Sequence, residues 1–220
     1  MHRIGPLYLA LIHLGISKIW LYISRIMKTL IIHPDDPTTA FLTQIYATLQ
    51  DKTVIKGGIS KTELREMIAE HDRIFLLGHG SPWGLLSMDQ FPFSGTYIID
   101  DSLVDELKEK SRNLYIWCNA DQFVRRHGLS GLHCGMFISE GMEALIYAYE
   151  DIDWATIEKA NDIFALIVAK YIDEPLEVLY ERLIYEYSLL ARTNPIAKFN
   201  LERLYCNSSS PKKNLNKLAG

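Results

Sequence analysis

Short apolar runs alternate along the chain with longer segments in which apolar residues recur at helical spacing. The runs that we expect to form strands are residues 30–33, 53–55, 74–78, 97–99, 114–118 and 144–149. Helices are expected at about 38–49, 60–71 and 101–110, from 153 onward and from 175 onward, with a helical turn at 122–127. Apolar runs of this length are typical of parallel strands that are buried on both faces. The alternation of strand and helix predicts an α/β fold with a mostly parallel sheet, helices on both faces and a helical C-terminal part.

Composition divides the chain into three segments. Residues 1–27 are apolar and carry three basic residues but no acidic one. Lys18 interrupts this stretch, which disfavours a membrane-spanning helix. We expect Met27 to be the natural start, with contact of an amphipathic helix with a membrane surface as the alternative. We expect residues 28–205 to form one domain and the polar residues 206–220 to be disordered.

Charge and cysteine usage exclude several classes of function. The net charge is −4 and basic residues do not cluster outside the C-terminal tail, so nucleic acid is not an expected partner. The three cysteines form neither a disulfide framework nor a CxxC metal pair, which indicates free thiols in a reducing, cytoplasmic compartment. His127 and His133 match no common ligand spacing, and we expect them to face solvent. We expect no metal ion or organic cofactor.

Two of the predicted strands lead into a reactive side chain. His79 and Gly80 follow residues 74–78, and Cys118 ends the run 114–118. Chemistry in open α/β sheets collects beyond the carboxyl ends of the strands, and the interval between these two allows them to be neighbours. A histidine there could take the proton of a thiol, and the amides of Gly80 and Cys118 could donate to an oxyanion. The pattern therefore predicts nucleophilic catalysis by Cys118 with His79 as the base.

The pair of motifs resembles a known family. His79-Gly80 after an apolar strand, and Cys118 at the end of the next one, resemble the caspase-like (clan CD) cysteine peptidases, most closely the CHAT-type bacterial members. Residues 137–149 are similar to the helix-Gly-strand segment of that family, and the resemblance covers about residues 28–185. It implies a three-layer caspase-like sandwich and an endopeptidase that uses a Cys/His dyad on a peptide or protein substrate.

The resemblance also implies a role for the acidic turn after residue 149. In some relatives that prefer basic residues, an acid in this turn pairs with a substrate arginine. Asp151 and Asp153 are the acids at this place in the chain, so the resemblance makes them candidate substrate-binding residues. An acid before a helix is also a common N-terminal cap, and that alternative stays open for both.

Departures from the family pattern support a second hypothesis. The caspase signature Q-A-C-[RQG]-G is absent, and Asn119 and Ala120 follow the cysteine where small residues or glycine are often found. The alternative is a caspase-like fold that serves as a binding or regulatory module without turnover.

A third hypothesis comes from the segment His33-Pro34-Asp35-Asp36. It resembles the zinc-binding motif of LmbE/PIG-L type deacetylases, in which the histidine and the second aspartate hold the metal. A catalytic zinc needs a third protein ligand, and the later histidine element and glycine-rich turn of that family are missing. The same residues are well suited to a turn between a strand and a helix.

Overall fold

The computed structural model describes residues 27–88 and 96–208. In this part of the chain the main sheet has six strands in the order β2-β1-β3-β7-β8-β9. They are β1 (Thr29–Ile32), β2 (Lys52–Ile55), β3 (Arg73–Leu77), β7 (Leu114–Ile116), β8 (Gly131–Cys134) and β9 (Leu204–Asn207). Neighbouring strands are parallel except β8 and β9, which are antiparallel. The predicted α/β fold with a mostly parallel sheet is confirmed.

A second, smaller sheet is inserted between β3 and β7. It is antiparallel and consists of β4 (Gly80–Ser81), β5 (Gly84–Leu86) and β6 (Tyr97–Ile99). A 3-10 turn, η2 (Asp101–Leu103), and α4 (Val104–Lys108) then lead back to the main sheet at β7. The insertion therefore begins at Gly80, the residue after His79.

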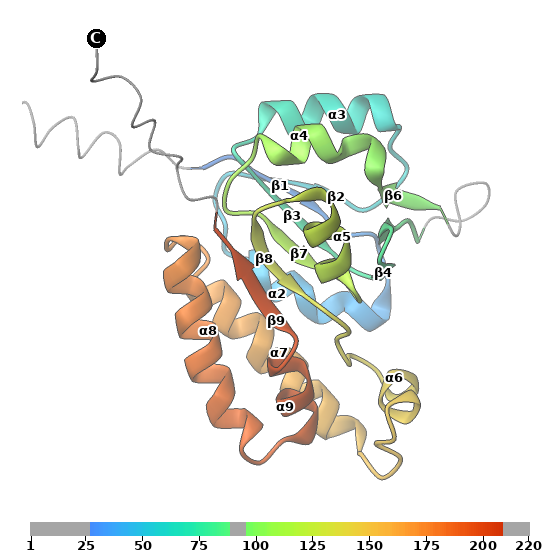
Figure 1. Ribbon diagram of the computed structural model, residues 1–220, viewed down its shortest axis with the longest axis vertical. Coiled ribbons are helices and arrows are strands. Elements are labelled where there is room, and N and C mark those ends of the chain that lie inside the picture. The colour runs from blue at the N-terminus through green and yellow to red at the C-terminus, as the bar shows by residue number, and fades with distance from the viewer. Residues whose placement is uncertain (1–26, 89–95, 209–220) are drawn as a thin grey trace, which may run out of the picture.

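Helices cover both faces of the main sheet (Figure 1). One face packs on α3 (Lys61–Glu70), α4 and α5 (Ala120–His127). The other packs on the 3-10 helix η1 (Pro37–Leu42), α2 (Thr43–Tyr46), α7 (Trp154–Lys170), α8 (Leu176–Ala191) and α9 (Pro195–Leu201). The helical C-terminal part is confirmed, and the three layers follow from a sheet that buries both of its faces.

The register of β3 and β7 sets the position of the candidate dyad. Every residue of β3 and β7 is buried, as expected for central strands with apolar side chains on both faces. Leu77 and Ile116 are paired, and each is the last residue of its strand. The prediction that the two strands are neighbours is confirmed.

Two local predictions are wrong. Residues 144–149 do not form a strand, because α6 (Gly141–Ile146) occupies the first half of this run and a turn follows it. Glu140 and Glu143 form a capping box that starts this helix, and Leu145 and Ile146 are exposed on it instead of packing in a sheet. His133 does not face solvent, because it lies in the buried strand β8.

The expected disordered tail also begins later than residue 206. Cys206 and Asn207 belong to β9, which pairs with β8 and is anchored by the buried side chain of Leu204. Residues 1–26 and 209–220 lie outside the described residues, and with them the expectations for the N-terminal extension and most of the tail. Every helix in the described ranges is too short or too polar to cross a membrane.

Candidate active site

His79 is positioned by the end of β3 and the first turn of the hairpin. Gly78, which separates it from the strand, has φ +139°, a backbone conformation that favours glycine. The chain turns there, and the His79 side chain emerges beyond the carboxyl end of the sheet with 22% of its surface exposed. The imidazole is therefore partly accessible, and it lies just beyond the end of a fully buried strand.

Cys118 lies in a sharp turn between β7 and α5. Asn119 has φ +66° in the left-handed region, which asparagine tolerates better than most residues, and its amide donates to the Gly135 carbonyl at 3.0 Å. Helix α5 begins at the next residue. The strand thus turns directly into a helix, and the thiol of Cys118 is presented at the edge of the sheet.

Trp117 connects the turn that contains Cys118 to the β4–β5 hairpin, which follows His79 in the chain. Its indole Nε1 donates to the Ser81 carbonyl at 3.0 Å. A Cβ on Gly80 would lie 2.0 Å from Trp117 Cδ1 and 2.6 Å from the Gly84 carbonyl oxygen, so only glycine fits under the indole. Gly80 is thus a point of close approach, chiefly to the Trp117 indole.

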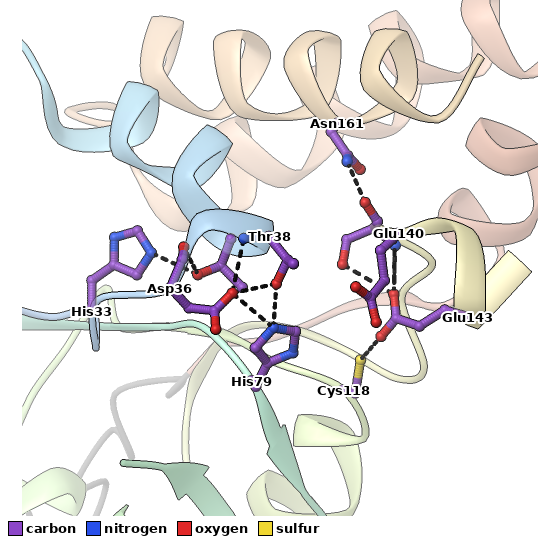
Figure 2. Close-up of polar contacts among 10 residues, drawn as sticks. His33, Asp36, Thr38, His79, Cys118, Glu140, Glu143 and Asn161 are labelled. Atoms are coloured by element: carbon purple, nitrogen blue, oxygen red, sulfur yellow. Dashed lines mark hydrogen bonds and ion pairs between the residues drawn. The ribbon is translucent and has the colours of Figure 1, made fainter. Parts of the chain in front are cut away.

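The structure brings His79 and Cys118 to one cavity. Each residue follows its strand by two positions, and both line a small cavity of about 20 Å³ together with Ile116 and Phe137. Figure 2 shows the two side chains on the same side of the sheet. Within the described ranges no hydrogen bond joins the imidazole to the sulfur; each side chain is held by other partners.

The imidazole of His79 is held by Thr38 and Asp36 (Figure 2). Its Nε2 lies 2.6 Å from Thr38 Oγ1 and 3.5 Å from Asp36 Oδ1. Partial burial of Asp36 acts to raise its pKa, but hydrogen bonds from Thr38 and the nearby His79 outweigh burial and lower it. Asp36 is therefore ionised and accepts the hydroxyl proton of Thr38, so Thr38 Oγ1 in turn accepts from Nε2–H. This leaves Nδ1 of neutral His79 without a proton.

The thiol of Cys118 has different partners. Its Sγ donates to the Phe137 carbonyl and to Glu143 Oε1, both at 3.4 Å. Burial raises the pKa of Cys118 to about 12, and the negative charge of Glu143 acts in the same direction. The other oxygen of Glu143 accepts from the amide and hydroxyl of Ser139 at 2.7 and 3.0 Å, which fixes the carboxylate. In this state the sulfur carries its proton.

Gly80 is the predicted oxyanion donor. The Leu86 amide donates to the His79 carbonyl at 2.8 Å, and Gly80 is paired with Leu85. Because bonded and non-bonded pairs alternate in an antiparallel ladder, Gly80 occupies a non-bonded position and its N–H points away from β5. The oxyanion role of Gly80 and Cys118 stays a prediction.

Asp151 and Asp153 are placed differently from the dyad. Both are exposed, and neither is among the residues that line the cavity of His79 and Cys118. Asp153 is the N-cap of α7, where its carboxylate accepts from the Thr156 amide at 2.6 Å. The capping alternative is confirmed for Asp153, and a substrate role for the two acids stays a prediction.

The two metal-ligand candidates of the HPDD motif, His33 and Asp36, have different partners in the structure. His33 is buried and its Nδ1 and Nε2 lie 2.9 Å from Tyr46 Oη and 3.3 Å from Thr39 Oγ1, whereas Asp36 turns to Thr38 and His79. Among the residues with assigned positions, no group of three or more His, Cys, Asp or Glu side chains is arranged to hold a metal ion. The motif thus connects η1 to His79 in this structure, a contact that the sequence alone did not indicate.

Sequence reasoning did not identify Thr38 or Glu143 as site residues. Thr38 follows the recognised HPDD segment, but its contact with His79 joins residues 41 positions apart. Glu143 contacts a cysteine 25 positions away, and its own signal, a capping box with Glu140, lies just before the run 144–149 that was interpreted as strand. No protein family model, curated protein or solved structure matches this chain.

Proposed function

We propose that the protein is a cysteine peptidase in which Cys118 is the nucleophile and His79 is the general base. The observation that carries this proposal is the register of β3 and β7: Leu77 pairs with Ile116, so the imidazole and the thiol leave the sheet at the same level and share one cavity. A buried thiol next to an oriented imidazole is the arrangement that thiol-based acyl transfer requires.

The reaction proceeds in two halves. The Cys118 Sγ–H proton passes to His79 Nδ1 as sulfur attacks the carbonyl carbon of the peptide, and the N–H groups of Gly80 and Cys118 stabilise the oxyanion. The imidazolium then protonates the leaving amine, the C–N bond breaks and a thioester remains. Water attacks the thioester with His79 as base, which releases the carboxylic acid and restores the thiol.

Thr38 and Asp36 have a positioning role in this scheme. The chain from Nε2–H through the Thr38 hydroxyl to the Asp36 carboxylate keeps the proton on Nε2 and leaves the lone pair on Nδ1. The ionised Asp36 also stabilises the imidazolium that forms during the reaction. The two residues thus perform for His79 the function of the orienting third member of a catalytic triad.

The thiol must leave Glu143 before it can react. Because its pKa is raised to about 12, a pre-formed thiolate is disfavoured in the state described. The proposal requires that the side chain rotates away from Glu143 and that Sγ reaches Nδ1, so that the proton leaves in the same step as the attack.

The fold is consistent with the resemblance to caspase-like peptidases and in this way supports the proposal. A mostly parallel six-stranded sheet with helices on both faces, which carries a histidine and a cysteine beyond two adjacent strands, is the arrangement that the caspase-like resemblance implies. We propose on this basis that the chain is a caspase-like peptidase, most similar to the CHAT-type bacterial members, and that its substrate is a peptide or protein.

A second candidate function is a binding or regulatory module without turnover. The observation that favours it is the contact of the Cys118 thiol with Glu143, which opposes the formation of a thiolate. In such a module the cavity would serve recognition, and loss of the thiol would have no effect on the function.

A peptide library separates the two functions. The full chain is incubated with an internally quenched peptide library, in parallel with Cys118→Ala and His79→Ala, and with Cys206→Ala as the control for a cysteine outside the cavity. The proposal expects cleavage by the wild-type chain and by Cys206→Ala, and none by the two dyad variants. Cleavage that all four proteins share, or that none shows, rejects the peptidase.

A further inference from the structure

A groove of about 370 Å³ adjoins the candidate active site on the side of η1 and α7. Phe41 and Ser139 line both this groove and the cavity that holds His79 and Cys118. Thr38, which holds the imidazole, also lines the groove. A peptide bound across the dyad would therefore continue into it. Volumes of this size accommodate a side chain with part of its backbone.

Asn161 lines this groove, and its side chain holds a buried acceptor without a hydrogen-bond partner among the described residues. The residue is 4% exposed and lines the groove, and its Nδ2 donates to the Ser139 carbonyl at 2.8 Å. That carbonyl can only accept, so the amide orientation is fixed and Oδ1 faces the other way. Among the described residues Oδ1 has no hydrogen-bond partner. Figure 2 shows the Asn161 side chain directed from its helix toward the segment that carries Glu140. A buried acceptor of this kind calls for an N–H or O–H donor from a ligand.

The charge of the groove comes from α7. Glu158 and Asp162 both line it, one helical turn apart, and no ion pair with Lys or Arg is found for either within residues 27–88 and 96–208. Asp162 accepts from the Gln44 amide at 2.7 Å, which holds its carboxylate at the groove. Trp154, one turn before Glu158, adds an indole that is 52% exposed.

We propose that this groove is a subsite for an arginine side chain of the peptide substrate, separate from the residue at the cleaved bond. The inference rests on the proposed peptidase function. A guanidinium has N–H donors in one plane and can stack on an indole, pair with carboxylates and donate to an amide oxygen at the same time. The groove offers each of these partners, with Trp154, with Glu158 and Asp162, and with Asn161 Oδ1. A lysine ammonium carries its three N–H donors on a single atom, so it cannot stack on the indole and reach the carboxylates and the amide oxygen at the same time.

Binding is measured with the full chain carrying Cys118→Ala, so that the probe is not consumed. The probes are two labelled peptides, acetylated and amidated, of sequence Ala-Ala-Arg-Ala-Ala and the same sequence with citrulline in place of arginine. Citrulline keeps the planar shape but has a carbonyl oxygen in place of one terminal nitrogen, so it retains about three of the five N–H donors and has no charge. The arginine peptide should bind about tenfold more tightly, because its hydrogen bonds to the carboxylates are charge-assisted.

Variants on the exposed surface of α7 test the residues. The double variant Glu158→Gln/Asp162→Asn should lower the affinity for the arginine peptide roughly fivefold. Its affinity for the citrulline peptide should not change, since the substitutions remove only the charge. Glu181→Gln, an exposed acid on α8, is the matched control and should change neither affinity. Asn161→Leu should weaken both peptides. If Asn161→Leu does not fold, the Glu158→Gln/Asp162→Asn variant alone tests the subsite.

The outcomes separate the subsite from the peptidase. Equal affinity for the two peptides, a preference for arginine that survives in the Glu158/Asp162 pair, or no measurable binding of the arginine peptide overturns the subsite. A preference for arginine that depends on these acids, in a wild-type chain that cleaves nothing, supports the subsite and rejects the peptidase. Cleavage without any dependence on arginine supports the peptidase and overturns the subsite.

Discussion

The thiol of Cys118 donates to Glu143 Oε1 at 3.4 Å, which connects the turn before α5 with the first turn of α6. The carboxylate cannot move away freely, because its second oxygen accepts two hydrogen bonds from Ser139. Burial and this negative charge together raise the pKa of Cys118. Both effects stabilise the protonated sulfur, so the resting protein is expected to have an unreactive thiol.

Removal of the charge should make Cys118 more reactive. Glu143→Gln keeps the shape of the side chain and its acceptor for Ser139 but has no negative charge. We expect the pKa of Cys118 to fall and its alkylation by iodoacetamide at about pH 8 to become roughly five to ten times faster, in proportion to the thiolate fraction. The rate is followed by mass spectrometry of the peptide that contains Cys118.

Two internal references make this measurement specific. Cys134 is fully buried, so iodoacetamide should not reach it although Glu143 also raises its pKa. The charge that raises the pKa of Cys206 is that of Glu177, so the alkylation rates of both cysteines in the same sample should not change. Glu181→Gln, which removes an exposed acid from α8, should leave all three rates unchanged. A rate for Cys118 that is the same with Glu143 and with Gln would contradict an electrostatic effect of this carboxylate.

The hydroxyl of Thr38 should matter for catalysis through the orientation of His79. Thr38→Val keeps the shape but cannot pass a hydrogen bond from Nε2–H to Asp36. We expect kcat to fall by about tenfold to a hundredfold with little change in KM, because a misoriented base affects the chemical step more than binding. Steady-state kinetics on a peptide that the wild type cleaves provide the measurement.

The conservative variant is the decisive control for Thr38. Thr38→Ser retains the hydroxyl and should restore most of kcat. Thr43→Val makes the same chemical change at an exposed position of α2 and should have no effect. Equal losses in the Val and Ser variants would assign Thr38 a packing role only.

The sequence was sufficient for the parts of the fold that depend on local pattern. The apolar runs of β1, β3 and β7 were recognised because these strands are buried on both faces. The pairing of β3 with β7, and with it the closeness of His79 and Cys118, followed from general rules for the order of elements in α/β sheets.

The elements and contacts that the sequence did not predict are α6, β9 and the contacts of Thr38 and Glu143 with the dyad. Residues 145–148 of the apolar run from Ala144 to Tyr149 are exposed, so its hydrophobicity gave the wrong element, whereas the capping box at Glu140 was the correct signal. Strand β9 was missed because its apolar residues are few and its pairing partner, β8, lies about seventy positions earlier. The contacts of Thr38 and Glu143 with the dyad are of the same long-range kind.

Gly80 should be intolerant of any side chain. In Gly80→Ala the new Cβ would overlap with Trp117 Cδ1 and with the Gly84 carbonyl oxygen, at 2.0 and 2.6 Å. We expect the free energy of unfolding, measured by urea denaturation, to fall by about 2–3 kcal/mol, as for other overpacked sites. Gly135→Ala is a suitable control, because that Cβ meets its nearest neighbour only at 3.5 Å and should cost less than about 1 kcal/mol. Similar losses at both positions would show that the indole can move aside.

His33 should make the protein sensitive to acid. Burial lowers the pKa of His33 to about 4, and the positive charge of Lys56 acts in the same direction. Below about pH 6.5 the unfolded chain binds a proton at this histidine that the folded chain does not bind, so stability is lost as pH falls from about 6.5 to 4, by roughly 2–4 kcal/mol. Urea denaturation at several pH values measures this loss. His33→Gln retains hydrogen-bonding groups for Tyr46 and Thr39 but does not titrate, so its stability should change much less over the same interval. An equal decline in the variant would place the acid sensitivity at another group.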